Sequence, residues 1–456
     1  MAGCQAWGGR RVAEIAQEMG MSQEYVYQQK AKVAEYAEKL DEEKPKGKMV
    51  EFDKKRKDRA ILSLALDCQS PIDGIVRFFD NVIEETSVSS GYISNVLTEA
   101  SKRARDYDGG IDLSRITQGA NDEIFQCGVP ILTGIDPEST YTYLLEEASD
   151  RTAETWALYL DDRKDHGLNL EISINDGGTG LMSGIPQVFP DVEIQADTFH
   201  AVYDMGKEVS KLERNANKLI KGEQALKDNL TSKNPRVKNE AALKELQPKV
   251  CDAISVYDTI FILYTWLKEL LSFSGYSMAE TLALAEWVLE EMASVPIPKL
   301  QKEVTKVRKI LPSLLSFIGR LEREMEASSK ESGIPIEGLK LMYKQRASRP
   351  GSPDNSTIHC KQLQILGERY NEAKVTFDRL MSKIKKASSL VENLNGRIRV
   401  FIEVKRVIPT NFFALLKVYF NTRKYKRSRC KERIGKTPLE LLTGTPHSTF
   451  FELLGF

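Results

Sequence analysis

The most constraining feature of this chain is the stretch from residue 117 to residue 200, where apolar residues change their spacing several times. GANDEIFQCG, VPILTGID and TYTYLLEEAS are typical of strands, separated by turn signals at Gly128 and Pro130 and at Asp136-Pro137. DRTAETWALYLDDRKDHG has helical spacing and stops at Gly167. The remaining segments predict a strand, a short helix, a strand and a long helix: NLEISINDGG, LMSGIPQVFP, VEIQAD and TFHAVYDMGKEVSKLERNANKLI.

The predicted order is therefore three strands, helix, strand, helix, strand, helix. This alternation indicates an α/β fold, in which a mixed sheet carries helices on both faces. It is the RNase H-like arrangement, and we expect an RNase H-like core. Residues 203–385 are nearly all helical by pattern and predict a large all-α insertion within that core.

Carboxylates occur where such a core would bring strands together. Asp122 lies on the first predicted strand and Asp176 ends the fourth, and these two points are neighbours in this arrangement. Gly177 and Gly178 leave backbone room for a phosphate or a metal. Hard divalent cations prefer oxygen ligands from converging segments, and two such ions can activate an attacking oxygen and stabilise a leaving one. A third carboxylate is expected from a late helix, and Glu392 in SSLVENLNGRIR is the candidate.

Asp136 is a rival for the first carboxylate. It ends the second predicted strand before Pro137, where a turn aspartate is common. About fifty residues separate Asp122 from Asp176, which leaves room for three strands and a helix, whereas Asp136 leaves one strand too few. Asp197 and His200 form a weaker pair, because a helix N-cap aspartate and a packed histidine explain them equally well.

The N-terminal region predicts two short helices with a tight turn over residues 10–36. Ala16, Gly20 and Val26 have the spacing of a helix-turn-helix, and Ser22 is a good N-cap for the second helix. An ordinary helical hairpin would have the same pattern. If the segment binds DNA, its second helix is the recognition helix and exposes polar residues to base edges and phosphates: Gln23, Tyr27, Gln28 and Lys30.

Two further segments favour contact with nucleic acid. A second helix-turn-helix-like segment is predicted before the sheet, and its last helix carries Lys102 and Arg103. A helical pre-domain that packs on the core would have the same pattern. The C-terminal segment, from about residue 386, is predicted to be helical and basic, with thirteen Lys and Arg and two Glu between Arg397 and Lys436. Its candidate phosphate contacts are Arg397, Arg399, Lys405, Arg406, Arg423 and Lys424.

The composition excludes only a few functional classes of protein. Lys+Arg and Asp+Glu are both 65, so net charge is zero, which leaves a local basic face possible. The six Cys form no CxxC pair, so a reducing cytoplasm is expected and a Cys-rich zinc site is not. No run of 18 apolar residues is present, so no membrane span is expected.

At these motifs the sequence resembles DDE-type transposases of bacterial insertion sequences. INDGGTGLMSGIPQVFPDVEIQADTFHAVYDM resembles their second-aspartate region, and NDEIF with GIDPEST their first. VENLNGRIR and KVYFNTRKYKRSRCKERIGKTPLELLTG resemble the helix of the third carboxylate and the tail that follows. The helical insertion before the Glu is most similar to Mutator-like transposases. Those often have Cys-x-x-His after the second aspartate, whereas this chain has Asp197-Thr198-Phe199-His200.

The resemblance implies a function and its partners. Asp122, Asp176 and Glu392 would be the catalytic, metal-binding DDE triad, with Mg²⁺ as cofactor and Mn²⁺ as a possible substitute. The partners would be double-stranded DNA, as transposon terminal inverted repeats and target, and a second copy of the chain in a dimer associated with the nucleoid. The alternatives are a transposase-derived DNA-binding regulator without catalysis and an RNase H-like nuclease without strand transfer.

These predictions divide the chain into five parts. They are a helix-turn-helix segment and linker at 1–50, a second helical DNA-binding domain at 51–115, the first part of the core at 116–205, the helical insertion at 206–385, and the last part of the core with the basic tail at 386–456.

Overall fold

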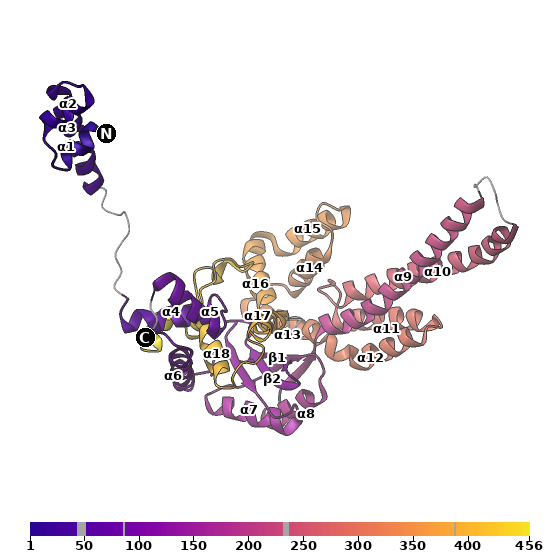
Figure 1. The fold of residues 1–456 in the computed structure, drawn as a ribbon. Helices are drawn as coiled ribbons and strands as arrows, with labels where there is room; N and C mark the ends of the chain where they lie inside the picture. The colour runs from indigo at the N-terminus through magenta and orange to yellow at the C-terminus, as the bar shows by residue number, and fades with distance from the viewer. Residues whose placement is uncertain (43–51, 85–86, 231–236, 387–388) are drawn as a thin grey trace. The chain divides into compact units, whose positions relative to one another are not determined.

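The computed structural model describes residues 1–42, 52–84, 87–230, 237–386 and 389–456 (Figure 1). The chain separates into two compact units, Met1–Lys57 and Asp58–Phe456. The predicted linker at the end of the 1–50 segment lies partly outside the described residues, which omit 43–51. The predicted boundaries within the second unit stay a prediction.

The described residues of the first unit include the helices α1 (Ala2–Trp7), α2 (Val12–Met19) and α3 (Gln23–Glu42). Gly20 ends α2 in the left-handed region at φ 63°, which glycine adopts without a Cβ clash. The Ser22 hydroxyl accepts from the Tyr25 N–H at 3.1 Å and caps the start of α3. Ala16 and Val26 are buried between the helices. The predicted helices and turn are therefore present, and their role in DNA binding stays a prediction.

The second unit is built on a five-stranded sheet in the order β3-β2-β1-β4-β5. Its strands are β1 (Gln118–Gln126), β2 (Val129–Ile135), β3 (Thr142–Glu147), β4 (Ile172–Asn175) and β5 (Glu193–Ala196). The first three strands form an antiparallel meander, and β4 and β5 add to β1 in parallel. The sheet is thus mixed, and the predicted strand and helix order is confirmed.

Helices cover both faces of this sheet (Figure 1). On one face lie α7 (Ala153–Asp165) and α8 (Thr179–Val188), whose Trp156 and Ile185 belong to a core shared with Leu132 of β2. On the other face lie α17 (Ser389–Lys405) and α18 (Phe412–Thr422). The Asn421 side chain of α18 accepts from the Thr142 N–H at 2.8 Å and donates to the Thr142 carbonyl at 2.9 Å, which satisfies part of the buried outer edge of β3.

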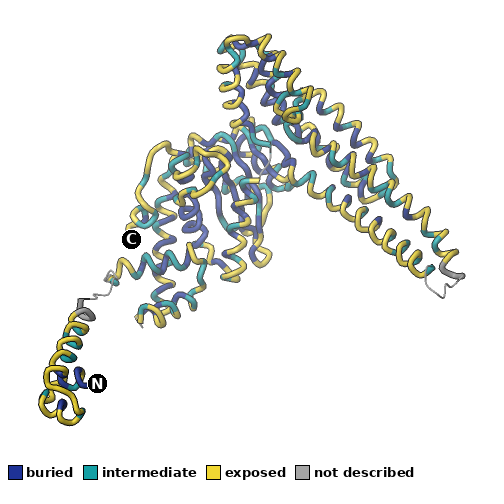
Figure 2. Tube along the Cα trace, turned by 90° about the horizontal axis from the view of Figure 1, so that it is seen from above, coloured by how far each residue is buried: buried dark blue, intermediate teal, exposed yellow. Residues whose placement is uncertain are grey.

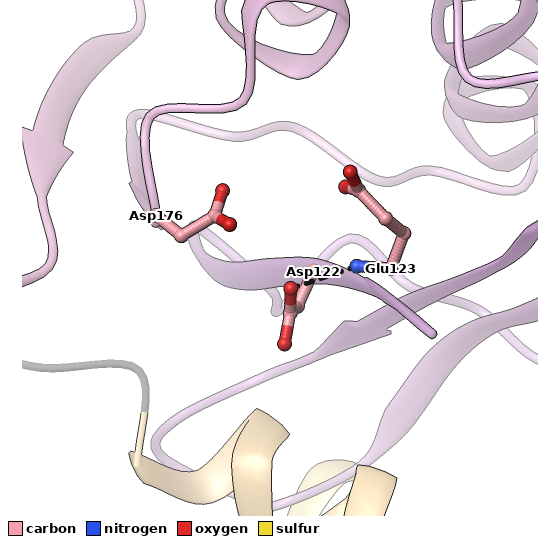
Figure 3. Close-up of side chains that lie close together, drawn as sticks. All are labelled: Asp122, Glu123 and Asp176. Carbon is pink, nitrogen blue, oxygen red and sulfur yellow. Dashed lines mark hydrogen bonds between the residues drawn. The ribbon is translucent and has the colours of Figure 1, made fainter. Parts of the chain in front are cut away.

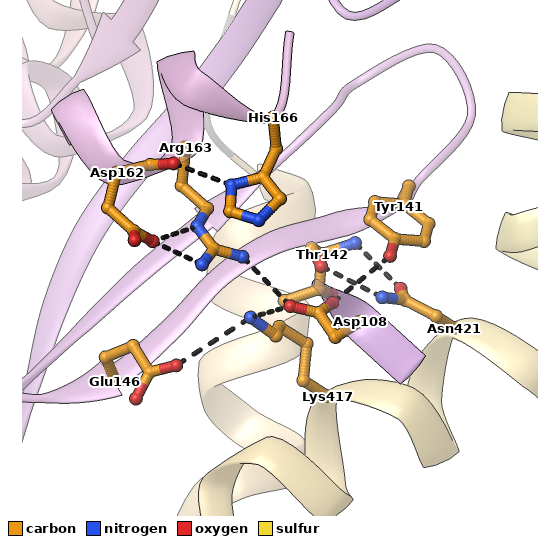
Figure 4. A network of polar contacts seen from close by, with 9 residues as sticks. All are labelled: Asp108, Tyr141, Thr142, Glu146, Asp162, Arg163, His166, Lys417 and Asn421. Carbon is orange, nitrogen blue, oxygen red and sulfur yellow. Dashed lines mark hydrogen bonds and ion pairs between the residues drawn. The ribbon is translucent and has the colours of Figure 1, made fainter. Parts of the chain in front are cut away.

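The described elements between α3 and the sheet are α4 (Lys54–Leu66), α5 (Ile72–Phe78), the π-helix η1 (Phe79–Ile83) and α6 (Ser90–Asp108). The predicted last helix of this segment is α6, capped by Ser89, whose hydroxyl accepts from the Tyr92 N–H at 3.2 Å. It packs on α18. A buried polar network around Asp108 joins α6 to α7, β3 and α18 (Figure 4).

The predicted helical insertion lies between β5 and α17. Its helices are α9 (Thr198–Leu230), α10 (Val237–Leu270), α11 (Met278–Ser294), α12 (Pro298–Leu314), α13 (Ser316–Ser332), α14 (Ile336–Ala347), α15 (Pro353–Leu366), the 3₁₀ turn η2 (Gly367–Arg369) and α16 (Tyr370–Lys383). The helices α9 and α10 form a long hairpin whose outer end is mostly exposed (Figure 2). Arg320 of α13 ties the insertion to β5 through an ion pair with Glu193 at 2.6 Å and a hydrogen bond to Gln195.

One described stretch, Glu240–Leu270 of α10, is long and apolar enough to cross a membrane by length and composition alone. A single helix of this kind is weak evidence and does not indicate a membrane protein. The same helix packs lengthwise against α9.

The C-terminal segment is less helical than predicted. After α18, residues 423–437 contain only the 3₁₀ turn η3 (Lys431–Arg433), and the chain ends in α19 (Pro438–Thr443) and α20 (Phe450–Leu453). Closely spaced like charges disfavour a helix here, and Gly435 and Pro438 interrupt one. Tyr425 instead forms an isolated parallel bridge with Ile434.

Candidate metal centre

Three carboxylates gather where β1 and β4 lie side by side. One oxygen each from Asp122, Glu123 and Asp176 lies within 4.8 Å of the others (Figure 3). The strand register explains this meeting, because Asn121 of β1 is paired with Asn175 of β4, and the two aspartates are the next residues along the parallel strands. Oxygen ligands at this separation suit a hard divalent cation.

Asp122 is the buried member of the group. Its carboxylate accepts from the Asn395 side chain of α17 at 2.6 Å and from the Glu123 N–H at 2.8 Å. Burial, followed by the negative charge of Asp176, raises the pKa of Asp122 to about 7 from an ordinary value of 3.8. Glu392 and Glu123 add to this repulsion. A bound cation would relieve it, so the electrostatics fit a metal site.

Glu123 is a member of the group that the sequence interpretation missed. Strand alternation directs it to the face opposite Asp122, so it looked like an ordinary surface neighbour (Figure 3). One of its oxygens pairs with Arg151 at 2.7 Å, just before α7. Among the described residues the other oxygen is buried without a hydrogen-bond partner. An orphaned carboxylate oxygen beside two aspartates is a ready metal ligand.

Asp176 is the exposed member, just past the end of β4. Its carboxylate accepts from the Gly178 N–H at 3.0 Å. The intervening Gly177 has φ 86°, a conformation that favours glycine, so the chain turns directly after Asp176. The backbone room for a phosphate or a metal at the glycine pair stays a prediction.

Glu392 lies near this group without belonging to it. Its oxygens contact His200 Nε2 at 3.2 Å and Arg399 Nη1 at 3.6 Å. Its charge nevertheless acts on Asp122 and helps to raise the pKa of that carboxyl. The structure therefore brings Asp122 and Asp176 together and leaves Glu392 at their edge, held by two cationic side chains.

His200 links Glu392 to a buried acid. Its Nδ1 lies 2.9 Å from Asp197, whose side chain is completely buried and also accepts from the Phe199 N–H. The hydrogen bond to Asp197 is the main cause that raises the pKa of His200 to about 9. Asp197 follows Ala196, which is paired with Asn175, so it lies beside Asp176 at the end of the next strand. Asp197 thus caps α9 and orients His200 at the same time.

Asp136 does not join the acidic group. Its carboxylate accepts from the N–H groups of Glu138 and Ser139 at 3.0 and 2.8 Å and from the Ser139 hydroxyl. Asp122 is paired with Thr133 and Ala120 with Ile135, so Asp136, just past the end of β2, lies toward the start of β1 and away from Asp176. It is the turn aspartate that the alternative interpretation described.

The predicted nucleic-acid contacts differ in their surroundings. On α3, Gln23, Tyr27 and Gln28 are exposed and Lys30 is half-buried. On α6, Lys102 is exposed, whereas Arg103 donates to the carbonyls of Leu454 and Gly455 and lies over the Phe456 ring. Arg103 therefore has an internal structural role.

The C-terminal cations also differ. Lys405 donates to the Ser70 carbonyl at 2.8 Å, and burial lowers its pKa to about 8. Arg399 pairs with Glu392, and Arg397 stacks on Phe420. The remaining candidates, Arg406, Arg423 and Lys424, are exposed.

Comparison with known families agrees with this geometry. Residues 131–320 match the family model DDE_Tnp_ISL3, described as "Transposase". The match confirms the similarity to DDE-type insertion-sequence transposases predicted from the sequence motifs. It runs from β2 to α13, so it includes Asp176 and His200 but neither Asp122 nor Glu392. No curated protein matches the chain significantly.

The raised pKa of Asp122 predicts that the free energy of unfolding of the metal-free protein depends on pH. Between about pH 4 and pH 7 the folded state keeps a proton that the unfolded chain releases, so stability falls as pH rises through this window. Asp122→Asn lacks this carboxyl. We expect the variant to exceed wild type in stability by up to about 4 kcal/mol at pH 8, and least near pH 4.

Urea unfolding in EDTA at several pH values measures this difference. A difference that is constant from pH 4 to pH 8 would contradict the assigned burial and repulsion at Asp122. Added Mg²⁺ should stabilise wild type and not the variant, because the variant lacks a central ligand.

Proposed function

We propose that this chain is a DNA transposase with an RNase H-like catalytic core that cleaves transposon ends and joins them to target DNA. The observation that carries the proposal is the meeting of Asp122 and Asp176 on adjacent parallel strands within a chain that matches a transposase family. The mixed sheet in the order β3-β2-β1-β4-β5, with helices on both faces, supports the RNase H-like core.

In this proposal Asp122, Asp176 and Glu392 hold Mg²⁺, with Mn²⁺ as substitute, and the free oxygen of Glu123 is a further candidate ligand. Bound ions of this kind lower the pKa of an attacking water or 3′-hydroxyl and stabilise the leaving oxygen. Asn395 fixes the orientation of Asp122. His200, itself oriented by Asp197, holds the Glu392 carboxylate beside the aspartates. These partners make the site stiff before substrate arrives.

The helices of the first unit supply DNA binding in the same proposal. The exposed Gln23, Tyr27 and Gln28 of α3 would meet base edges, and the basic C-terminal segment would contact phosphates. The complex would act in the cytoplasm as a dimer that pairs two transposon ends.

The test uses labelled duplex DNA that carries the terminal inverted repeats flanking the gene. We expect strand cleavage at the repeat boundary with Mg²⁺, none in EDTA, and joined products when target DNA is added. Cleavage without joined products would instead indicate a nuclease. Binding without cleavage in either Mg²⁺ or Mn²⁺ would indicate a DNA-binding regulator and would overturn the enzymatic proposal.

A further inference from the structure

Phe199 and Tyr203 form an exposed aromatic pair in the first turns of α9. They are 51% and 52% exposed, and their rings stack with centroids 5.7 Å apart and an angle of 14° between the planes. Four positions separate them, so they lie one turn apart on the same face of the helix. Large apolar side chains that gather on a surface usually mark a place that another molecule covers.

The other face of α9 supplies the packing that holds this helix. Met205 is buried in the core of the helical insertion, and Val202 packs against that core. The Val202 carbonyl also accepts from the Tyr264 hydroxyl of α10 at 3.2 Å. Because Phe199 and Tyr203 point away from this core and are exposed, the fold of α9 does not depend on their rings.

The aromatic pair begins beside the candidate metal centre. Phe199 lies edge-to-face on the His200 ring, with centroids 5.5 Å apart, and His200 Nε2 lies 3.2 Å from Glu392. Asp197, two residues before Phe199, lies beside Asp176 through the pairing of β4 with β5. Side chains of a helix lean toward its N-terminus, so the Phe199 ring leans toward the strand ends that carry the carboxylates.

Lys207 lies at the other end of the ring stack. Its ammonium is 4.3 Å from the centre of the Tyr203 ring, and it pairs with Asp204 at 2.7 Å. The order along α9 is therefore Phe199, Tyr203 and Lys207, each one turn after the last. The end of the stack at Phe199 is the one nearest the acidic centre. A further flat ring would extend the stack there, and a nucleobase is such a ring.

We propose that Phe199, supported by Tyr203, stacks on an unpaired base of the DNA end that lies in the acidic centre. The inference rests on the proposed function, which supplies the DNA. Removing a base from a duplex costs free energy, and stacking on an aromatic ring offsets part of that cost. One ring contact separates Phe199 from His200, so the base is that of the nucleotide adjoining the cleaved phosphate. Every base has a flat face, so the contact is tolerant of sequence.

The experiment compares cleavage of two inverted-repeat duplexes that differ at the nucleotide adjoining the cleavage point, which is paired in one and mismatched in the other. We expect Phe199→Ala to cleave the paired duplex about tenfold more slowly than wild type, or slower still. On the mismatched duplex the base is already unpaired, so the variant should come within about threefold of wild type. A structural disturbance of the acidic centre would slow cleavage of both duplexes equally.

Further variants separate stacking from apolar volume. Phe199→Trp keeps a flat ring and should restore most of the cleavage lost in Phe199→Ala. Phe199→Leu keeps apolar volume without a flat ring and should be as slow as Phe199→Ala. Tyr203→Ala should slow cleavage of the paired duplex less, because Tyr203 only supports the ring that meets the base. Tyr276→Ala is the matched control, since Tyr276 is 43% exposed on the separate segment between α10 and α11.

A fluorescent base provides a second readout that needs no cleavage. 2-Aminopurine is quenched while it is stacked in a duplex, so it reports when the base at the repeat boundary leaves the stack. In Ca²⁺ or EDTA, binding of wild type should raise its fluorescence. Phe199→Ala should bind the duplex with an affinity within about twofold of wild type and raise the fluorescence much less, because other contacts supply most of the affinity.

Three results would overturn the inference. Equal slowing of both duplexes by Phe199→Ala would assign the ring a structural role beside His200. Cleavage of the paired duplex by Phe199→Leu at the wild-type rate would show that apolar volume suffices. Loss of a dimer in Phe199→Ala, measured by sedimentation, with unchanged 2-aminopurine fluorescence would identify a contact with a second copy of the chain. In each case wild type still cleaves DNA, whereas failure of the proposed function removes cleavage from wild type itself.

Discussion

Asp176→Asn should reduce metal-dependent cleavage of transposon ends by about a thousandfold or more while duplex binding stays within about twofold of wild type. Asp176 is exposed and its only described side-chain acceptor contact is with the Gly178 N–H, so the amide can replace it without loss of packing. The amide removes a negative charge from a group of three carboxylates and cannot replace it as an anionic metal ligand.

Single-turnover cleavage of labelled duplex in Mg²⁺ measures the cleavage rate, and a gel-shift titration in Ca²⁺ or EDTA measures the affinity for the duplex. Asp191→Asn is the matched control, because Asp191 is an exposed aspartate between α8 and β5, outside the acidic group. Cleavage by Asp176→Asn at the wild-type rate would refute the assigned triad. Glu123→Gln in the same assay would show whether the additional carboxylate shares the metal.

The strand order could be predicted from the sequence because turn residues mark where the strands end. Gly128 follows Cys127, and both have positive φ in the two-residue turn between β1 and β2. Gly177 marks the end of β4 in the same way. With the strands in this order, β1 and β4 are parallel neighbours. The register of Asn121 with Asn175 then places Asp122, in the middle of β1, beside Asp176, just past the end of β4.

The rest of the site depends on contacts that no local pattern encodes. Glu123 points to the opposite face of β1 from Asp122, and only the turn after β4 brings Asp176 within reach of both. Glu392 arrives across the helical insertion, so its place relative to the aspartates follows from the packing of α17 on the sheet. The contacts that join Asp197, His200 and Glu392 could therefore not be predicted without knowing how α17 packs on the sheet.

Charge patterns predicted DNA contacts least well, because the sequence does not distinguish a basic residue that contacts DNA from one that contacts its own chain. Arg103 is a predicted phosphate contact, and its guanidinium donates to the carbonyls of Leu454 and Gly455. Arg397 and Lys405 belong to the same basic segment, yet Lys405 has an internal acceptor and Arg397 has none among the described residues. Desolvation and partner geometry, rather than residue type, separate the two cases.

Asp108→Asn should lower the free energy of unfolding of the second unit by about 3–5 kcal/mol. Asp108 of α6 is an ion-pair partner of both Arg163 of α7, at 2.9 Å, and Lys417 of α18, at 2.7 Å (Figure 4). It also accepts from the Tyr141 hydroxyl at 3.3 Å. Lys417 is 1% exposed, and its other anionic contact among the described residues is Glu146, at 3.8 Å. Without the Asp108 charge, Lys417 would keep the longer contact with Glu146, and the half-buried Arg163 would keep its ion pair with the exposed Asp162.

Urea unfolding followed by tryptophan fluorescence measures the loss, and Lys417→Met is the informative comparison. Methionine fills much of the lysine volume and leaves Asp108 paired with Arg163, so we expect that variant to be near wild type in stability. If Asp108→Asn and wild type have the same free energy of unfolding, Arg163 and Lys417 must be compensated by other anions or by water. If instead both variants lose several kcal/mol, the Lys417 ion pair itself stabilises α18 against β3, and with it the packing of the face that carries α17 and Glu392.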